Sequence, residues 1–152
     1  MKLFFSDFRG RIAGLATVVA FSGLAACDSD TTKEPVATSF ELNGTWTSEF
    51  GEEAINDTTW TNYVAQKVIK FDNAANMAIV QNPADAEWGP NDFSRAEWLE
   101  PTADSFKYCV VVYGQKTAAE AESAPTPDTI DRNDVDGVGC GGAPWSVLTR
   151  KK

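Results

Sequence analysis

The chain has 152 residues, of which 43% are hydrophobic, and a formal net charge of −9, with no histidine. This acidic balance excludes a nucleic-acid partner, because neutralising phosphates requires clustered Lys and Arg. The absence of histidine excludes Ser-His-Asp hydrolases and histidine-ligated metals or haem, so no cofactor is predicted. Carboxylate chemistry, lysine chemistry and oxygen-ligated calcium sites remain compatible with the composition.

Residues 1–26 have the three-part pattern of a secretory signal peptide. Lys2, Arg9 and Arg11 make the N-terminus basic, and an uncharged stretch follows from residue 12 to residue 26. This stretch is shorter than the ~18 residues expected of a membrane-spanning helix, so it is interpreted as the apolar region of a signal peptide. An ordinary signal peptide cleaved nearby and an uncleaved anchor are the alternatives.

The sequence Leu24-Ala25-Ala26-Cys27 ends this stretch and resembles the lipobox of bacterial lipoproteins. The resemblance implies that Cys27 carries diacylglyceryl and acyl chains, such as palmitate, and becomes the new N-terminus. Several acyl chains on one residue are sufficient for stable anchoring. We therefore expect a lipid-anchored protein of the bacterial cell envelope. The choice between inner and outer membrane, and between the periplasmic and the surface side, stays open.

Residues 27–39 are predicted to be the lipidated N-terminus and a flexible tether, because they are polar and contain Pro35. Residues 40–152 are predicted to form a single β domain, which is long enough for one core. In an oxidising envelope compartment, Cys109 and Cys140 are expected to pair and close a loop of about 31 residues. Two free buried thiols are the alternative.

Apolar and polar residues alternate along most of the β domain, which predicts strands. A capping box at Thr117 and Glu120 predicts a short helix over residues 118–124, and residues 82–92 and 125–142 are predicted to be loops. The fold class is mainly β: a small antiparallel barrel or sandwich of seven or eight strands, with one short helix and one disulfide. The expected strand segments, in chain order, are 40–50, 54–56 with 58–63, 67–71, 77–81, 93–100, 106–113 and 145–150.

Two further resemblances concern the β domain. Asn43-Gly44-Thr45-Trp46 resembles the G-x-W opening of lipocalin-like barrels, which implies that Trp46 closes one end and that Arg150 packs over its ring. The strings ELNGTWTSEFG, FDNAANMAIVQN, FSRAEW, YCVVVY and CGGAPW resemble a group of uncharacterised Gram-negative lipoproteins. That second resemblance implies the same architecture and a Cys109–Cys140 pair, and it brings no known activity.

The candidate ligand-binding residues are Trp46, Trp88, Arg95 and Glu97. Arg95 and Glu97 share one face of their strand. They could orient a polar ligand if that face points into a barrel, and the favoured interpretation is an outward surface ion pair. Trp88 lies in a loop between two prolines. We expect it to fold back as a lid on the core, with a ligand mouth or a partner contact as the alternatives.

Two acidic features have less specific interpretations. Residues 128–136 place several acidic residues before Gly137, which predicts a solvated loop and no metal site, with an irregular calcium site as the alternative. The chain also has enough carboxylates for a glycosidase pair, although their spacing selects no two of them. These carboxylates are Glu52, Glu53, Asp57, Glu97 and Glu100.

The sequence therefore predicts a non-enzymatic, lipid-anchored envelope protein whose lipocalin-like β domain binds a small amphipathic ligand. The alternative is an envelope protein–protein interaction or structural module with a core filled by side chains, which the many large aromatic residues favour. A carboxylate-based glycosidase is a distant third. The expected partners are the membrane, through the lipid, and either a small apolar ligand or another envelope protein.

Overall fold

The structure is a computed structural model that describes residues 39–152. The predicted signal peptide, the lipidation of Cys27 and nearly all of the predicted tether lie outside the described residues. No helix between residues 39 and 152 combines the length and the apolar composition needed to cross a membrane.

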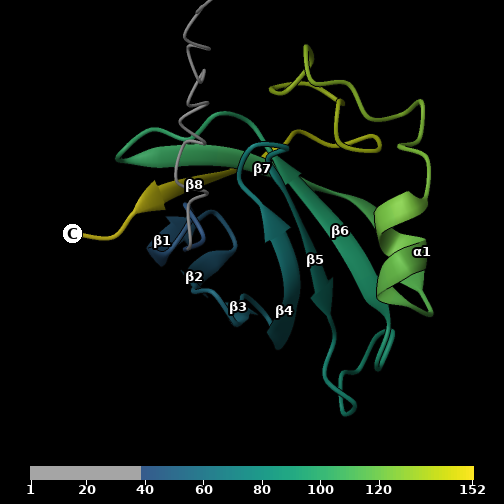
Figure 1. The fold of residues 1–152 in the computed structure, drawn as a ribbon. Helices are drawn as coiled ribbons and strands as arrows, with labels where there is room; N and C mark the ends of the chain where they lie inside the picture. The colour runs from purple at the N-terminus through teal and green to yellow at the C-terminus, as the bar shows by residue number, and fades with distance from the viewer. Residues whose placement is uncertain (1–38) are drawn as a thin grey trace, which may run out of the picture. The chain divides into compact units, whose positions relative to one another are not determined.

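The described residues form a closed, eight-stranded antiparallel β-barrel (Figure 1). This confirms the predicted fold class. Consecutive strands are neighbours all the way round, and the ring closes where β1 pairs with β8 through Trp46 opposite Arg150 and Thr47 opposite Thr149. The strands are β1 (Gly44–Ser48), β2 (Gly51–Ile55), β3 (Thr59–Thr61), β4 (Ala65–Asp72), β5 (Met77–Gln81), β6 (Phe93–Trp98), β7 (Ser105–Gln115) and β8 (Ser146–Arg150).

One end of the barrel, here called the closed end, is filled by residues 40–43, which come just before β1. Phe40 and Leu42 are almost completely buried, and Phe40 stacks on Phe71 with ring centroids 4.8 Å apart. Asp57, in the turn between β2 and β3, accepts hydrogen bonds from the Phe40 backbone N–H at 2.8 Å and from the Asn43 side chain at 2.9 Å. These contacts hold the apolar plug in place.

Trp46 and Arg150 complete the closed end in the way that the lipocalin-like motif implies. The Arg150 guanidinium carbon lies 4.0 Å from the centroid of the Trp46 ring, which is completely buried. A Cβ at Gly44 would lie 2.4 Å from Arg150 Nη1, and φ is 148° at this position, so another residue would strain the backbone and displace the guanidinium. The three residues of the motif therefore form one packed unit.

Large side chains fill the barrel between its walls. Six aromatic rings contact one another in edge-on or tilted arrangements, including Trp46 with Phe106 and Trp60 with Tyr108. Aromatic residues bury 150–250 Å² each, so a few of them occupy most of a narrow barrel. The inner core consists of Phe40, Leu42, Trp46, Ile55, Trp60, Val68, Ala78, Val80, Ala96, Trp98, Phe106, Tyr108 and Leu148.

A second, smaller core lies on the outer face of β7, under the long connection from β7 to β8. This connection contains α1 (Ala118–Ser123), which begins at the predicted capping box of Thr117 and Glu120. The disulfide between Cys109 and Cys140 ties the connection to β7, as expected. The outer core consists of Cys109, Val111, Val112 and Trp145, with Leu99, Ala124, Ile130, Val135 and Cys140 packed against them.

The first predicted strand differs from the observed structure at both ends. Residues 40–43 form a turn, in which the Asn43 N–H donates to the Phe40 carbonyl, and the next strand begins at Gly51 and not at Ala54. The physical reason is the backbone at Gly44 and Gly51, where φ is 148° and 126°, values that residues with a side chain rarely adopt. Gly44 thus interrupts the run that alternation predicts from residue 40 to residue 50, and Gly51, just after that run, begins β2.

Candidate functional site: a buried carboxylate at the barrel mouth

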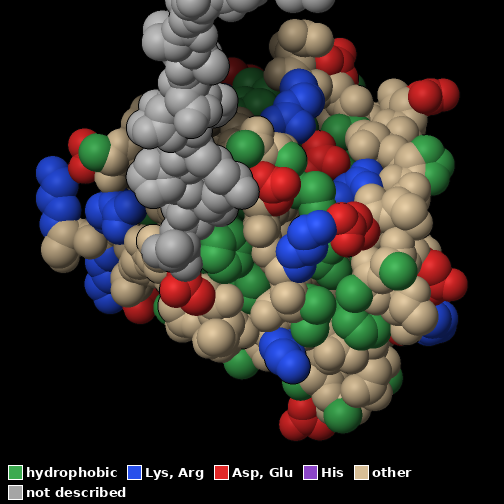
Figure 2. Space-filling model, in the orientation of Figure 1, with side chains coloured by type: hydrophobic (Ala, Val, Ile, Leu, Met, Phe, Trp, Pro, Cys, Tyr) green, Lys and Arg blue, Asp and Glu red, His purple; other side chains and the backbone are tan. Residues whose placement is uncertain are grey.

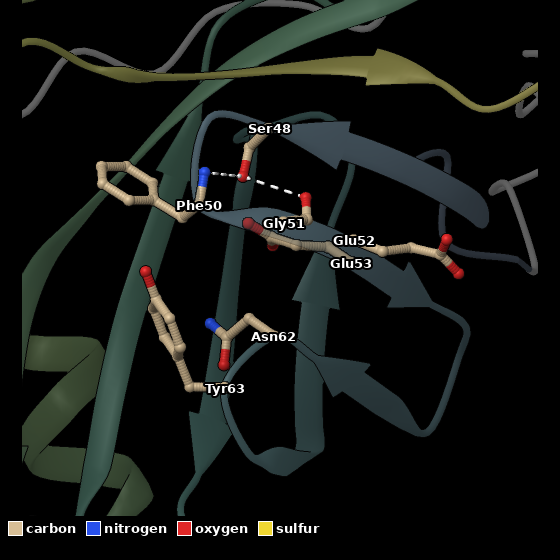
Figure 3. Close-up of a pocket in the computed structure, with 7 residues that line it drawn as sticks. All are labelled: Ser48, Phe50, Gly51, Glu52, Glu53, Asn62 and Tyr63. Atoms are coloured by element: carbon tan, nitrogen blue, oxygen red, sulfur yellow. Dashed lines mark hydrogen bonds between the residues drawn. The ribbon is translucent and has the colours of Figure 1, made fainter.

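The end opposite the plug, here called the mouth, is formed by the β1–β2 and β3–β4 turns, the β5–β6 loop and the start of the β7–β8 connection. Glu53 lies just inside it. Along β2, Glu53 and Ile55 face inward and are buried, whereas Glu52 faces outward and pairs with Lys151. Figure 3 shows these two carboxylates on opposite sides of the strand. A strand alternation of period two is sufficient to place one glutamate inside the barrel.

Two neutral groups hold the Glu53 carboxylate, which is only 4% exposed. The Trp60 indole N–H donates to Oε2 at 2.8 Å, and the Tyr108 hydroxyl donates to Oε1 at 3.1 Å. Among the described residues, no lysine or arginine forms an ion pair with this carboxylate. Glu53 is thus a buried acid with two neutral hydrogen-bond donors, one from β3 and one from β7.

Burial raises the pKa of Glu53 above its ordinary value, because a low-dielectric surrounding disfavours the charged carboxylate. The hydrogen bonds from Trp60 and Tyr108 favour the charged form and offset part of this increase in pKa. The pKa of Tyr108 is also raised, first by its own burial and then by the nearby negative charge of Glu53. Tyr108 therefore remains a hydrogen-bond donor at neutral pH.

A small pocket opens from Glu53 toward the solvent. Its volume is about 40 Å³, enough for a few water molecules or a small polar group but far below the 300–1,000 Å³ of a typical drug-sized ligand site. Two aromatic side chains stand at its rim, Phe50 at 59% exposure and Tyr63 at 78% (Figure 3). The lining residues are Ser48, Phe50, Gly51, Glu52, Glu53, Asn62 and Tyr63.

A larger cavity of about 300 Å³ lies on another side of the same β1–β2 turn. It shares Ser48 and Phe50 with the mouth pocket, and its remaining wall comes from the β7–β8 connection and β8 through Asp136, Trp145 and Val147. Phe50 is thus exposed to two neighbouring hollows. The Trp145 ring itself is buried, so the second cavity is lined by the edge of the outer core.

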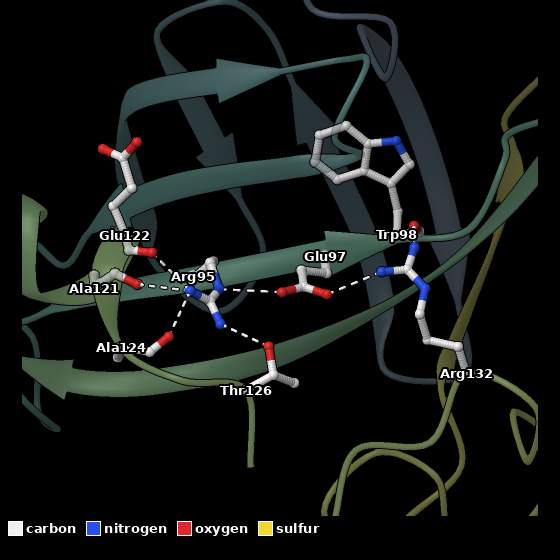
Figure 4. A network of polar contacts seen from close by, with 8 residues as sticks. All are labelled: Arg95, Glu97, Trp98, Ala121, Glu122, Ala124, Thr126 and Arg132. Carbon is white, nitrogen blue, oxygen red and sulfur yellow. Dashed lines mark hydrogen bonds and ion pairs between the residues drawn. The ribbon is translucent and has the colours of Figure 1, made fainter. Parts of the chain in front are cut away.

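Arg95 and Glu97 lie on the outer face of the barrel, but they are covered and not at a free surface. Arg95 is 6% exposed and donates to the α1 carbonyls of Ala121, Glu122 and Ala124, at 3.4, 2.8 and 2.9 Å (Figure 4). It also pairs with Glu97 at 3.1 Å, and Glu97 in turn pairs with Arg132 at 2.9 Å. The predicted surface ion pair is therefore part of a buried network that holds the C-terminus of α1 against β6.

None of the four predicted ligand-binding residues lines the mouth pocket. Trp46 lies at the closed end, and Arg95 and Glu97 lie outside the barrel. The expected Trp88 lid is wrong, because this side chain is 80% exposed and its backbone carbonyl accepts from the Asn82 side chain. The β5–β6 loop is held by such polar bonds to Asn82, so it does not need an apolar anchor in the core.

The other acidic candidates have structural partners. In the loop before Gly137, Asp134 accepts from the backbone of Val138, and Asp136 pairs with Lys107. Within residues 39–152, no group of three or more His, Cys, Asp or Glu side chains is arranged to hold a metal ion. On the face drawn in Figure 2, acidic and basic side chains are interspersed, which is consistent with several surface ion pairs.

The sequence contains a signal for the position of Glu53, which the spacing of the carboxylates does not reveal. Glu53 stands two residues before Ile55, so both belong to one face of a strand, and Ile55 is an obvious core residue. The partners Trp60 and Tyr108 could not be found in this way, because they come from β3 and β7 and meet Glu53 only when the barrel is closed.

The buried carboxylate makes a prediction for the dependence of stability on pH. Because the folded pKa of Glu53 is raised above its unfolded value, its contribution favours folding most below the unfolded pKa, and this is lost as the pH rises through the folded pKa. We expect Glu53→Gln to remove this decline. The unfolding free energy of the variant should therefore rise relative to that of the wild type as the pH increases from about 4 to 8. Urea unfolding across this range measures it. The matched control is Glu52→Gln, and a similar slope in both variants would contradict the assignment.

The fold and the mouth together define a class: a small up-and-down antiparallel β-barrel with a lipocalin-like closed end and an acidic pocket at the other end. Comparison with known proteins adds no relative, since no family model, no curated protein and no solved structure matches the chain.

Proposed function

We propose that this chain is a lipid-anchored lipoprotein of the bacterial cell envelope, and that its barrel is a non-enzymatic module that binds a small amphipathic ligand at the mouth. The observation that carries the binding part is the buried Glu53 carboxylate at the base of a pocket with Phe50 and Tyr63 exposed at its rim. A polar base and an aromatic rim match a molecule with one polar and one apolar part. Because the inner core is filled, the ligand would sit at the mouth and not along the barrel axis.

The lipid anchor is supported by the sequence alone, through the basic N-terminus, the uncharged stretch and Leu24-Ala25-Ala26-Cys27. The barrel adds one compatible feature. Phe40, close to the start of the described residues, lies at the closed end of the barrel and not at the mouth. Mass measurement of the N-terminal peptide from the native membrane, with Cys27→Ala as control, tests the anchor. An unmodified N-terminus cut elsewhere would refute it.

Binding is tested by titrating the isotope-labelled full chain with small amphiphiles and following the indole N–H signal of Trp60 by NMR. This N–H donates directly to Glu53, so a ligand that reaches the carboxylate must change its environment. Hexylammonium, hexanoate and 1-hexanol share one apolar tail and differ in the charge of the head. A saturable shift with any of the three supports ligand binding at the mouth, and the absence of a shift with all three refutes it.

A protein partner is the second candidate, and the exposure of Trp88 favours it. The Trp88 side chain is 80% exposed on the β5–β6 loop. Tryptophan is enriched among the residues that contribute most of the binding energy at protein interfaces, so this exposed indole is a candidate contact for a partner. A photo-crosslinking side chain at position 88 in cells, compared with one at the neighbouring Glu87, tests for a contact. A discrete crosslinked product specific to position 88 supports this function, and its absence at both positions argues against it.

A further inference from the structure

The Glu53 carboxylate has no cationic partner within the described part of the chain. Its two contacts come from the neutral Trp60 and Tyr108 side chains. A buried carboxylate is costly unless it is paired, and neutral donors compensate for only part of the lost hydration. A cation that enters the pocket from solvent would supply the missing partner.

The Glu53 carboxylate offers further hydrogen-bond acceptor sites to the pocket. A carboxylate has about four lone-pair sites, and Trp60 and Tyr108 occupy only some of those on Glu53. The Ser48 hydroxyl, which accepts from the Phe50 N–H and donates to the Gly51 carbonyl, and the Asn62 side chain, whose oxygen accepts from the Val64 N–H, also line the pocket. Among residues 39–152, no lysine or arginine lines this pocket. Such a site is complementary to a group that carries positive charge and several N–H donors, and it repels an anion.

The size of the pocket and the aromatic residues at its rim further limit which cationic group can bind. A volume of about 40 Å³ admits an ammonium group with a water molecule but no bulky head. The exposed rings of Phe50 and Tyr63 stand where the group enters, and aromatic faces attract cations and also cover an apolar tail. The net charge of −9 raises the local concentration of cations around the chain.

We propose that the mouth pocket binds a primary ammonium group, with its positive charge and N–H donors directed at the Glu53 carboxylate and its apolar tail lying against Phe50 and Tyr63. The inference rests on the proposed function, since it names the chemical class of the ligand for the same site. The ammonium can belong to a free amphiphilic amine or to the head of a lipid such as phosphatidylethanolamine.

The acylated full chain in dodecyl maltoside, an uncharged detergent, is titrated separately with hexylammonium, hexanoate and 1-hexanol. We expect hexylammonium to shift the Trp60 indole N–H saturably, and to bind about ten-fold or more tightly than the other two. Equal or tighter binding of hexanoate or hexanol at the same signal would overturn the ammonium assignment and leave the proposed function standing. No shift with any of the three would remove both. Repeating the titration in micelles that contain phosphatidylethanolamine distinguishes the two sources, because a bound lipid head displaces the signal before hexylammonium is added.

Glu53→Gln tests the role of the charge, because glutamine keeps the shape and can still accept a hydrogen bond from Trp60. We expect its affinity for hexylammonium to fall about ten-fold or more, whereas Glu100→Gln, at an exposed carboxylate that does not line the pocket, leaves the affinity unchanged. Equal affinities in the two variants would contradict the proposal.

A pH titration of the wild type keeps the test valid if Glu53→Gln does not fold. The affinity should decrease as the pH falls through the pKa of Glu53, since protonation removes the negative charge. The other titratable groups near Glu53 are Tyr108 and Tyr63, and phenols ordinarily titrate near pH 10. Glu52 also lines the pocket and pairs with Lys151, so the same titration of Glu52→Gln separates its contribution from that of Glu53. An affinity that does not change between about pH 8 and pH 4 would refute the assignment.

Discussion

Replacing Arg95 with methionine is expected to destabilise the protein by about 3–5 kcal/mol, the usual effect of removing one partner from a buried ionic network. Arg95 donates to three carbonyls at the C-terminus of α1 and to the Thr126 hydroxyl, and it neutralises Glu97. Methionine fills a similar volume but leaves these acceptors without their donor, and Glu97 then keeps only its ion pair with Arg132. The midpoint of urea unfolding, followed by tryptophan fluorescence, measures the change.

Two variants serve as controls for Arg95→Met. Lys70→Ala removes another link between the barrel and α1, but the ion pair of Lys70 with Glu122 is exposed, so little change is expected. Arg95→Lys keeps the charge and loses the planar fork that reaches several carbonyls at once, so its stability should lie between those of the wild type and Arg95→Met. If Arg95→Met were no less stable than Lys70→Ala, the network would have no role in stability.

The second large effect is expected from the disulfide. The bond between Cys109 and Cys140 closes a loop with a sequence separation of 31, and the chain-entropy estimate for such a loop is about 3–4 kcal/mol. The Cys109→Ala, Cys140→Ala double variant should lose about this much stability, a large share of the ~5–15 kcal/mol of a small domain. It should also lose protection from proteolysis in the β7–β8 connection, because the bond holds that segment on the outer core.

Reduction of the wild type provides the matched measurement. A reductant should lower the unfolding midpoint of the wild type to about that of the double variant and leave the variant itself unchanged. A double variant as stable as the oxidised wild type would show that the packing of Trp145 and Val135 is sufficient to hold the connection without the covalent bond.

The fold was largely accessible from the sequence because most strands are exposed to solvent on one face. The run from Phe106 to Tyr113 and the hairpin around Asp72 and Asn73 carry clear local signals, and the structure has β7, β4 and β5 there. The start of β1 at Gly44 could not be predicted from alternation, since it depends on the approach of Arg150 from the far end of the chain. Alternation along a strand gives no information on such contacts.

The candidate site was much less accessible. Side-chain alternation assigns Arg95 and Glu97 to one face, but it cannot say whether that face is inside, outside or beneath a helix; this depends on where the β7–β8 connection returns. For Glu53 the reverse holds. Ile55 indicates which face of the strand Glu53 occupies, but the hydrogen bonds to its carboxylate come from Trp60 and Tyr108, which are distant in sequence. Trp88 is predicted to be a lid folded back on the core, and the polar bonds of its loop, which leave it exposed, have no sequence signal.

Strand β7 is a wall shared by the inner and the outer core, and this has a consequence for any mutational study of the barrel. Tyr108 faces Glu53 inside, while the next residue, Cys109, is bonded to Cys140 outside. Side chains that are adjacent on one backbone cannot relax separately, so substitutions on the two faces of β7 should not be additive. A double-mutant cycle between Tyr108→Phe and the disulfide would therefore report on both cores at once, and energies assigned to either core from single variants along this strand would include part of the other.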